Sequence, residues 1–408
     1  KWTASGLPSC FVGVLIADVI GDAREEIIHV GEGRVTCLDG TDGSEIWAHP
    51  DEHIGYYCQP QMADLDQDGI LEVIVPLQYP YRNPGCLALH GNNGSLYWKR
   101  QGLGGNSITA SPVIADIDGE GYPTIFIGSE NAYTEPYDGM LTALSYDGRI
   151  LRQTSVYRPC GGGFSIADTD NDGDFELFMG DRTGSGSRPG RSVICFDAHT
   201  LEVLWDRRDL GGAFSSHCPM LADVDGDGIL DVCVQNQRGG IYVLNSTDGS
   251  TVIGSSDVDM PGHYQPSIYD VDGDGNLEML FADGVHSSTP DDIRIWDLVE
   301  WREDARMDVG LCYYAPQVGE VTGDNGVMDI IACNYTAIFI FSYIQQIGTY
   351  ALADAVTGLA GWLTYAVVQD IDGDGLNEVV VASMGGRVYA YDTPAPRPNP
   401  RARSEVQF

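Results

Sequence analysis

Lysine is nearly absent from this chain of 408 residues, which contains only Lys1 and Lys99. The 22 lysines and arginines face 60 acidic residues, and the formal net charge is −38. A surface of this sign repels phosphate backbones and anionic headgroups, which argues against nucleic acid or an anionic membrane as a partner. The chain also lacks any apolar run of about eighteen residues, so the sequence predicts no membrane-spanning helix.

Familiar catalytic motifs are missing as well. The sequence has no His-Glu-x-x-His zinc pair, no Gly-x-Ser-x-Gly elbow and no Walker loop for phosphate. The run Gly161-Gly162-Gly163 is better interpreted as a turn than as a phosphate cradle. These absences favour a binding or structural protein over an enzyme.

A short acidic loop is the most distinctive feature that is present. Residues 223–231 read Asp-Val-Asp-Gly-Asp-Gly-Ile-Leu-Asp, with carboxylates at positions 1, 3, 5 and 9 and Gly228 at position 6. Alternating carboxylates on a tight turn repel one another unless a hard divalent cation, best Ca²⁺, lies between them. Five loops are complete, which predicts about five calcium sites. Their predicted ligands are Asp64, Asp66, Asp68, Glu72, Asp168, Asp170, Asp172, Glu176, Asp223, Asp225, Asp227, Asp231, Asp270, Asp272, Asp274, Glu278, Asp370, Asp372, Asp374 and Glu378.

Three degenerate loops, starting at Asp18, Asp116 and Glu320, complete a series of eight with a period of about fifty residues. That period is typical of propeller blades. Short β-branched runs such as Val73-Ile74-Val75 follow the loops, and they predict strands where an EF-hand would have a helix. The sequence therefore predicts an all-β, eight-bladed β-propeller of four-stranded blades over residues 1–393.

These Asp-x-Asp-x-Asp-Gly-x-x-Asp/Glu loops resemble those of the FG-GAP/VCBS repeat family, which includes the integrin α-subunit head. The resemblance covers nearly all of residues 1–393 and implies that each loop joins the first and second strands of a blade. The integrin-type adhesion function is not implied, because the loops alone do not carry it. The chain also resembles the eight-bladed propellers of some rhamnogalacturonan lyases. A polysaccharide lyase is thus the alternative function, with His217 or His263 as possible bases.

Tryptophans mark the expected fourth strands. The next loop begins 17 residues after Trp47, 18 after Trp98 and 18 after Trp205, and the first loop begins 16 residues after Trp2. Trp2 therefore belongs to a fourth strand whose earlier strands are not N-terminal. Because the last repeat has only three strands, we predict that the N-terminal strand completes the eighth blade and closes the ring.

Cysteines and glycosylation motifs indicate the compartment. The ten cysteines occur as two or none per repeat, which favours disulfides within blades, in an oxidising environment; buried thiols are the alternative. Some of these pairs would join non-adjacent strands. Asn93, Asn245 and Asn334 begin Asn-x-Ser/Thr motifs on expected turns, which favours an extracellular or cell-surface glycoprotein. The pairs within repeats are Cys10 and Cys37, Cys58 and Cys86, Cys160 and Cys195, Cys218 and Cys233, and Cys312 and Cys333.

The C-terminal segment 394–408 differs from the rest. It is rich in proline and carries Arg397, Arg401 and Arg403, which predicts an extended basic tail on an acidic body. Such a tail is either a linker or a segment that docks on a neighbouring subunit, and repeated head-to-tail docking produces filaments.

Aromatic residues and His53 gather in the segments that precede first strands. They are expected near one mouth of the ring, where they either pack between blades or form a platform for carbohydrate. The sequence favours a secreted, calcium-stabilised adhesion or assembly module whose partner is a second copy, another surface protein or a glycan. The aromatic residues are Tyr56, Tyr57, Phe214, Tyr264, Tyr313, Tyr314, Trp362 and Tyr365.

Overall fold

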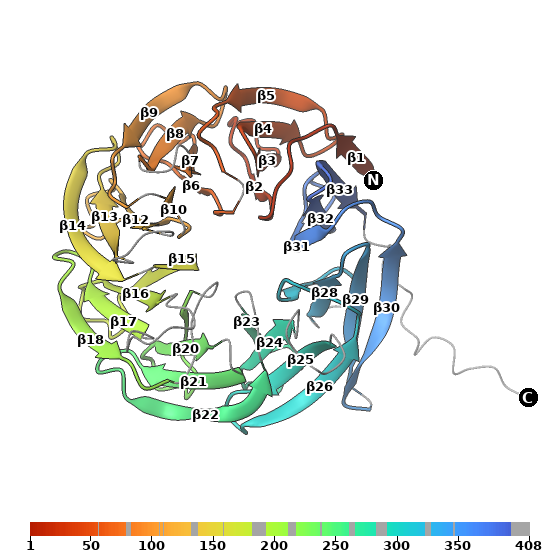
Figure 1. Cartoon of the computed structure of the whole chain (residues 1–408). Helices are drawn as coiled ribbons and strands as arrows, with labels where there is room; N and C mark the ends of the chain where they lie inside the picture. The colour runs from red at the N-terminus through yellow and green to blue at the C-terminus, as the bar shows by residue number, and fades with distance from the viewer. Residues whose placement is uncertain are drawn as a thin grey trace, which may run out of the picture.

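Figure 1 shows a computed structural model of the whole chain, in which the strands form a ring. The structure describes residues 1–392 except 56, 79–82, 106, 109, 132–137, 158, 182–192, 211–217, 237–238, 261–265, 283–291, 323–327 and 346. The side chains of residues 138, 157, 159–162 and 256–260 also lie outside the described part, as does the tail, 394–408. No helix among the described residues is long and apolar enough to cross a membrane.

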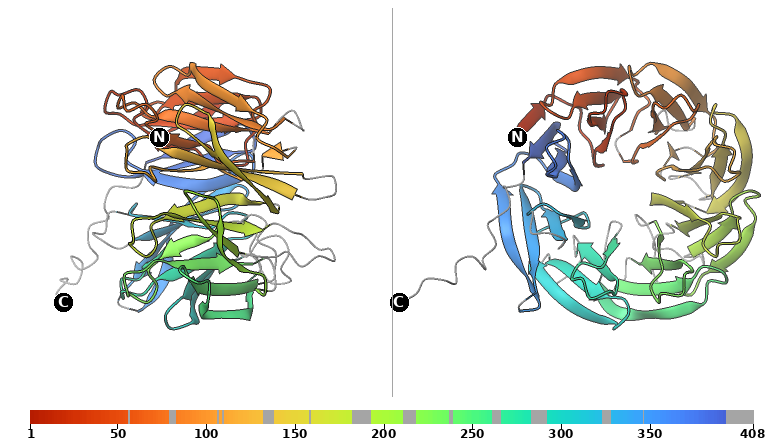
Figure 2. Two further views of the ribbon diagram at one scale, coloured as in Figure 1. Left: turned by 90° about the vertical axis from the view of Figure 1, so that its left-hand side faces the viewer. Right: turned by 180° about the vertical axis from the view of Figure 1, so that it is seen from behind.

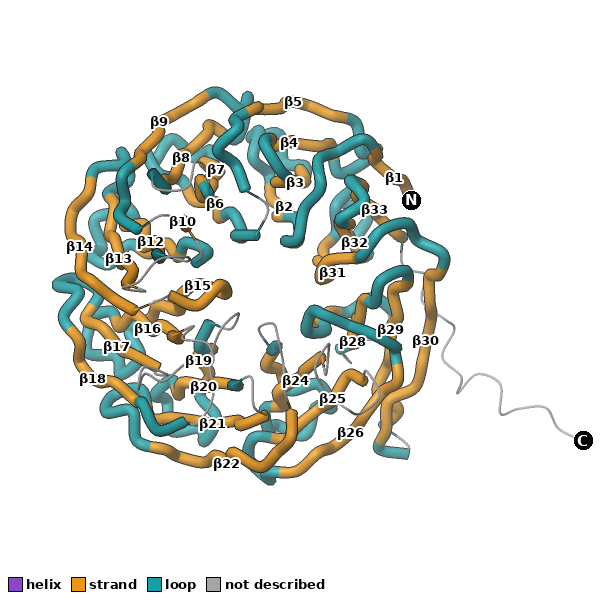
Figure 3. Tube along the Cα trace, viewed as in Figure 1, coloured by secondary structure: helices purple, strands orange, loops and turns teal. Residues whose placement is uncertain are grey.

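The strands form eight antiparallel sheets, and each sheet is one blade of the ring. The first strand of each blade lies nearest the centre and the fourth on the rim (Figures 1 and 3). The predicted all-β, eight-bladed propeller is therefore confirmed. Blades one to four comprise β2 (Leu15–Ala17), β3 (Glu26–Gly31), β4 (Arg34–Asp39) and β5 (Glu45–Pro50); β6 (Gln61–Ala63), β7 (Glu72–Leu77), β8 (Gly85–His90) and β9 (Leu96–Gln101); β11 (Val113–Ala115), β12 (Thr124–Glu130), β13 (Asp138–Leu144) and β14 (Ile150–Tyr157); and β15 (Pro159–Ala167), β16 (Glu176–Asp181), β17 (Val193–Asp197) and β18 (Val203–Arg207).

The third blade has a short additional strand, β10 (Ser107–Ile108), which also pairs with β12. The second half of the ring repeats the four-stranded plan. Blades five to eight comprise β19 (Met220–Ala222), β20 (Asp231–Gln235), β21 (Gly239–Asn245) and β22 (Thr251–Met260); β23 (Ser267–Tyr269), β24 (Glu278–Ala282), β25 (Asp292–Asp297) and β26 (Arg302–Asp308); β27 (Gln317–Gly319), β28 (Asp329–Cys333), β29 (Ala337–Ile344) and β30 (Thr349–Thr357); and β31 (Leu363–Gln369), β32 (Glu378–Ser383), β33 (Arg387–Tyr391) and β1 (Trp2–Ser5).

The ring is closed by the two ends of the propeller domain. Strand β1 pairs antiparallel with β33, with Trp2 opposite Ala390 and Ser5 opposite Arg387. The eighth blade thus takes three strands from the C-terminal side and one from the N-terminal side, as the tryptophan spacing predicts. Figure 2, seen from behind, shows the two segments side by side at the closure. Pairing of this kind covers the backbone edge that an open sheet would expose.

The hydrophobic core lies between blades. Strand β7 is buried along its whole length, and its side chains alternate between the two neighbouring blades. Val73 and Val75 pack with residues of the first blade, whereas Ile74 packs with residues of the third. Eight such clusters fill the eight interfaces of the ring. Burial of each such Val or Ile contributes about 1.5–3 kcal/mol, so every blade depends on both of its neighbours.

A tryptophan joins several blades to the next one along the chain. Trp205 in β18 donates its indole N–H to Ser246 O, at 2.6 Å, in the turn between β21 and β22. The ring covers Gly249 in that turn, where an added Cβ would lie 2.7 Å from the indole and where φ is +70°. The same donor bond and the same covered glycine occur at Trp2 with Gly43, Trp47 with Gly94, and Trp98 with Gly148.

Substitution of Gly249 tests this contact. We expect Gly249→Ala to lower the free energy of unfolding by about 2–4 kcal/mol, because it adds a clash with Trp205 to the cost of a positive φ. Gly33→Ala is the matched control, since Gly33 has φ +76° but open space where the Cβ would lie. That variant should lose only about 1 kcal/mol. Equal losses in urea denaturation would show that the tryptophan contact contributes nothing.

Candidate metal centres

In the acidic loops that begin with aspartate, this first residue shapes the turn. Asp223 Oδ1 accepts hydrogen bonds from the amides of Gly226 (2.8 Å) and Asp227 (3.1 Å), and its Oδ2 accepts one from Gly228 (3.0 Å). Gly228 adopts φ +88°, a conformation that favours glycine. The turn is therefore formed by contacts between the carboxylate and its own backbone. Equivalent bonds are made by Asp64, Asp116, Asp168, Asp270 and Asp370.

The carboxylate at position 9 begins the second strand and is buried. Glu278 is 1% exposed, and its Oε2 accepts a hydrogen bond of 2.9 Å from the amide of Val271, at position 2. One carboxylate oxygen thus closes the loop at its base and leaves the second oxygen for another partner. Equivalent bonds join Glu26 to Val19, Glu72 to Leu65, Glu176 to Thr169, Asp231 to Val224, Asp329 to Val321 and Glu378 to Ile371.

Within the loops the other carboxylate oxygens converge. Asp270, Asp272 and Glu278 each place one oxygen within 4.8 Å of the other two. Glu278 Oε1 is buried and has no hydrogen-bond partner among the described residues. Oxygen donors in this number and spacing suit a hard cation such as Ca²⁺, although calcium binding itself stays a prediction. Similar triplets are formed by Asp64, Asp66 and Asp68, by Asp168, Asp170 and Asp172, and by Asp223, Asp225 and Asp227.

Burial makes these carboxylates difficult to ionise in the metal-free protein. Burial, with repulsion from Asp272 and Asp270, raises the pKa of Glu278 to about 8. For the same reason the pKa of Asp231 is raised to about 6 and that of Glu26 to about 7. A divalent cation in the loop would offset this repulsion, because it favours the ionised form of every carboxylate around it.

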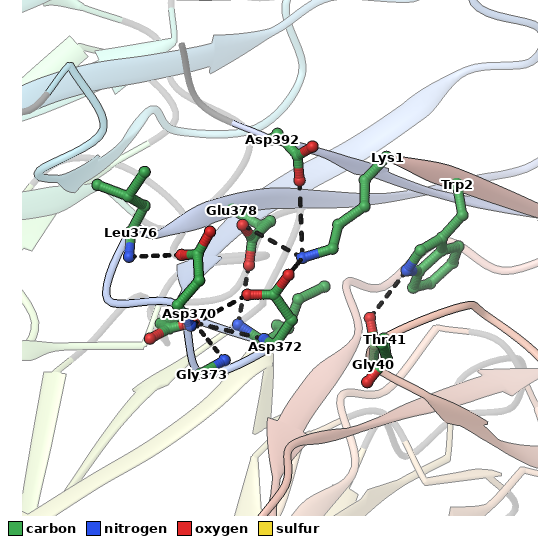
Figure 4. A network of polar contacts seen from close by, with 12 residues as sticks. Lys1, Trp2, Gly40, Thr41, Asp370, Asp372, Gly373, Leu376, Glu378 and Asp392 are labelled. Atoms are coloured by element: carbon green, nitrogen blue, oxygen red, sulfur yellow. Dashed lines mark hydrogen bonds and ion pairs between the residues drawn. The ribbon is translucent and has the colours of Figure 1, made fainter. Parts of the chain in front are cut away.

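The loop of the eighth blade already faces a cation from the chain itself. Lys1 Nζ forms ion pairs with Asp372, with Glu378 at 3.4 Å and with Asp392 at 3.6 Å (Figure 4). Asp372 and Glu378 occupy positions 3 and 9 of that loop. Trp2, beside Lys1, donates its indole N–H to Gly40 O in the first blade. The loop pattern gave no indication of this contact, which depends on ring closure.

The loop of the second blade differs from the others because a histidine faces it. His90 lies opposite Glu72 in the register of β7 and β8, with Nδ1 3.1 Å from Glu72 Oε1. One ligand atom each from Asp66, Glu72 and His90 lies within 4.8 Å of the others. Other blades have Asp197, Asn245 or Asp297 at this register position. The sequence analysis did not identify His90. Its position at the end of a third strand could have indicated that it lies beside the position 9 carboxylate.

The degenerate loops contain fewer carboxylates than the complete ones. Ile20 replaces the aspartate at position 3 of the first loop, and Thr124 replaces the acid at position 9 of the third. In the seventh blade, Asp329 accepts hydrogen bonds from the hydroxyls of Thr322 (3.0 Å) and Ser342 (2.5 Å). Protein donors there supply the contacts that a cation would otherwise make. Residue 324, also expected in this loop, lies outside the described part.

The predicted disulfides within blades are wrong for the cysteines that the structure describes. Cys10 precedes β2 and Cys37 lies in β4, so β3 separates them. Neighbouring strands lie about 4.8 Å apart. Strands two places apart are therefore too distant for the Cα separation of about 4.4–6.8 Å in a disulfide. In the second blade, β7 likewise lies between Cys58, which precedes β6, and Cys86 in β8. In the fourth blade, β16 lies between Cys160, whose side chain is not described, and Cys195.

Buried thiols, the alternative expected from the sequence, are what the structure contains. Cys312 Sγ lies 2.9 Å from Cys333 O, to which it donates a hydrogen bond in place of a disulfide. Burial raises the pKa of Cys10 to about 12, so its thiol stays protonated and unreactive. The cysteines consequently no longer argue for an oxidising compartment. The nine described ones, all buried, are Cys10, Cys37, Cys58, Cys86, Cys195, Cys218, Cys233, Cys312 and Cys333.

The three glycosylation motifs lie at turns, but they are not equally accessible. Asn93 is exposed, and its Oδ1 accepts the amide of Ser95 at 2.8 Å. Asn245 is half-buried in a similar turn. Asn334 Nδ2, the atom that a glycan would modify, donates to Val309 O at 2.7 Å. The geometry therefore favours Asn93 as an acceptor, and glycosylation itself stays a prediction.

The histidines offer no assembled catalytic site among the described residues. His53 Nδ1 lies 2.5 Å from Asp51 Oδ1, and Lys99 Nζ lies 2.5 Å from Asp51 Oδ2. Although burial acts to raise it, hydrogen bonds from Lys99 and His53 lower the pKa of Asp51 to about 2. His53 is thus engaged in an ion-pair network between the first and second blades. The candidate bases His217 and His263 lie outside the described residues, as do Tyr56, Phe214 and Tyr264.

Comparisons with known proteins agree with this fold. Residues 223–281, which span the loops at Asp223 and Asp270, match the family of FG-GAP-like repeats. No curated protein matches the chain significantly in sequence. The fold and the loops together define the molecule as an eight-bladed β-propeller that contains an FG-GAP-like repeat.

Several solved structures are similar in fold alone. The V. cholerae biofilm matrix protein Bap1 is 14% identical with a TM-score of 0.64, over 97% of this chain and 91% of that one. The quinohemoprotein alcohol dehydrogenase of Comamonas testosteroni is 13% identical with a TM-score of 0.66, over 98% and 77%. A Bacillus licheniformis rhamnogalacturonan lyase is 14% identical with a TM-score of 0.53, over 96% and 91%. Because these proteins differ in activity, the fold does not select a function.

The raised pKa values predict how the metal-free protein responds to pH. Glu278, Glu26 and Asp231 hold protons in the folded state at pH values where the unfolded chain releases them. The stability that these three groups contribute should therefore be complete below about pH 4 and should be lost as pH rises through about 6–8. We expect the melting temperature of dialysed protein to drop on the order of 5 °C across that range, and millimolar Ca²⁺ to reverse the drop. A melting temperature independent of both pH and calcium would contradict this account.

Substitution of Glu278 separates the cost of its charge from its role as a ligand. In metal-free protein at pH 9, Glu278→Gln should raise stability on the order of 1–3 kcal/mol, because it removes a buried unpaired charge. In calcium it should lower the stabilisation gained and remove one bound ion, counted by native mass spectrometry. Glu202→Gln, at an exposed site outside the loops, is the control. An unchanged ion count would show that the charge of Glu278 is not needed to hold the ion.

Proposed function

We propose that this protein is an extracellular, calcium-stabilised propeller that serves as a surface adhesion or assembly module. The observation that supports this most directly is the place of the acidic loops. Each complete loop joins the first and second strands of one blade, and its position 9 carboxylate is tied to the backbone at the loop base. Cations held there would fasten hairpins together and would not activate a substrate. Extracellular modules typically bind calcium at about 10⁻⁴–10⁻³ M, which matches such a role.

Contacts at the end of the ring opposite the acidic loops, where the blade-to-blade connections lie, support a structural role as well. Tyr314 in the seventh blade donates its hydroxyl hydrogen to Phe11 O, at 2.6 Å, in the segment that leads into the first blade. Tyr365 of β31 packs edge-on against Tyr314, with 5.9 Å between ring centroids. The side chains of Tyr314 and Tyr365 thus meet the backbone of the segment that leads into the first blade. Loops that meet in this way favour a scaffold over an open catalytic channel.

The tail supplies a route to assembly. Segment 394–408 lies outside the described residues, but its three arginines contrast with a body of strongly negative charge. Attraction between a basic tail and an acidic neighbouring subunit would join copies head to tail, and such contacts extend into filaments if they do not close. A fold shared with a biofilm matrix protein is compatible with this proposal.

Electron microscopy of the purified chain tests the assembly. In calcium we expect filaments or larger rings in negative stain, and we expect them to disappear when residues 394–408 are removed. A variant with Arg397, Arg401 and Arg403 all changed to Gln keeps the length of the tail and isolates its charge. Dispersed single propellers in every sample, with and without a chelator, would exclude the assembly role.

The second candidate is a rhamnogalacturonan lyase, since two such enzymes are among the proteins of similar fold. Uronate elimination requires a base and a cation beside the substrate carboxylate. We expect no unsaturated product, measured by its ultraviolet absorbance, when the full chain is incubated with rhamnogalacturonan and calcium. Product formation that is lost in His217→Ala or His263→Ala would replace the adhesion proposal with the lyase.

A further inference from the structure

Three aromatic rings from separate connections form a stack at the boundary of blades seven and eight. Trp362 and Tyr335 lie 4.5 Å apart between ring centroids, with 27° between their planes. Trp362 and Tyr313 lie 5.7 Å apart at 20°. Tyr313 belongs to the β26–β27 connection, Tyr335 to the β28–β29 turn and Trp362 to the β30–β31 connection. Residues far apart in sequence therefore build one aromatic surface.

Trp362 is exposed and yet held in place. The residue is 46% exposed, although its ring is stacked against Tyr335 and Tyr313. The backbone carbonyl of Trp362 accepts a hydrogen bond of 2.8 Å from the amide of Met384. The turn that carries Tyr335 is fixed by the bond from Asn334 Nδ2 to Val309 O. A large ring that is both exposed and pre-positioned loses little conformational entropy when it binds a ligand.

A second aromatic pair, of which one ring is exposed, lies at the same end of the ring. Phe11 and Tyr57 stack with 4.9 Å between centroids and 30° between planes, and Tyr57 is 55% exposed. The hydrogen bond from Tyr314 to Phe11 O joins this pair to the first stack, because Tyr313 and Tyr314 are consecutive. Two exposed aromatic faces are thus connected through one segment of chain.

Both aromatic groups lie at the end opposite the acidic loops. Strands alternate in direction within each blade, so first-to-second loops lie at one end and blade-to-blade connections lie at the other. Phe11, Tyr57, Tyr313 and Trp362 all belong to blade-to-blade connections, and Tyr335 belongs to a second-to-third turn, which lies at that same end. The candidate calcium loops are therefore spatially separate from this surface.

The chemistry of the surface matches a neutral sugar chain. The flat C–H faces of pyranose rings stack on exposed aromatic rings, and the tyrosine hydroxyls are of the kind that bond sugar hydroxyls. Polyanions are disfavoured by the net charge of −38 and by Asp308, an exposed carboxylate that accepts the amide of Gly310 in the connection that carries Tyr313. Two separated aromatic faces suit a ligand that extends over several sugar units.

We propose that this end of the propeller binds a neutral polysaccharide, with Trp362 and Tyr57 as two stacking positions along one chain. The inference names a ligand class for the adhesion module and rests on that proposed function for its biological setting. The binding itself requires neither the tail nor assembly. Failure of binding and failure of assembly are consequently separate results.

Affinity electrophoresis of the full chain tests the binding. Native gels in calcium would contain laminarin, hydroxyethylcellulose or galactomannan as neutral probes and polygalacturonate as the polyanion. We expect retardation in at least one neutral gel and none in polygalacturonate. Trp362→Ala and Tyr57→Ala should each weaken that retardation about tenfold or more, whereas Trp362→Tyr, which keeps a flat ring, should retain most of it. Melting temperatures of the variants show whether each one folds.

Tyr122→Ala is the matched control, because Tyr122 is 42% exposed and its ring lies 4.5 Å from that of Tyr146, between centroids, at the end with the acidic loops. It should migrate like the unmodified chain in every gel. The proposal is overturned if no neutral gel retards the protein, or if Trp362→Ala and Tyr57→Ala bind as well as the unmodified chain. Retardation by polygalacturonate alone would also overturn it. If binding fails while calcium stabilisation and assembly persist, only the ligand class is wrong.

Discussion

A carboxylate buried at the start of the second strand is the group on which the acidic loops depend. In seven of the eight blades it accepts the backbone amide of loop position 2, and thereby fastens the hairpin at its base. The same burial makes its charge costly, as the raised pKa of Glu278 shows. The carboxylate that closes the loop is therefore also the group whose ionised form a nearby positive charge would stabilise. Calcium is the proposed partner in most complete loops, and Lys1 approaches that role in the eighth blade.

The blades are held together by hydrophobic clusters between neighbours and by closure of the ring. Because each hydrophobic cluster lies between two blades, none of the blades has a core of its own. Closure through β1 and β33 therefore matters to every interface and not only to the eighth blade. The indole–glycine contacts add a directional link between successive blades at the rim.

The two ends of the ring carry different chemistry. One end holds the acidic loops, whose carboxylates converge on possible cation sites. The other end holds the blade-to-blade connections, where Tyr57 and Trp362 expose aromatic rings. This separation follows from the antiparallel order of the strands, which sends alternate connections to opposite ends. Substitutions in the acidic loops and substitutions in the aromatic groups therefore affect opposite ends of the ring.

The sequence by itself determined the number of blades, the place of each acidic loop and the closure by Trp2, because all three depend on spacing along the chain. It also indicated the position 9 carboxylates, since an acid before a β-branched run begins a buried strand. The cysteine pairs were wrong because repeat membership does not say which strands are neighbours. Cys10 precedes β2 and Cys37 lies in β4, and the order β2-β3-β4-β5 places β3 between them. Only the tertiary structure decided the features that need contacts between distant residues: His90 opposite Glu72, Lys1 in the eighth loop, and Trp362 on Tyr335. Each depends on register or on ring closure, which bring together residues that no local pattern connects.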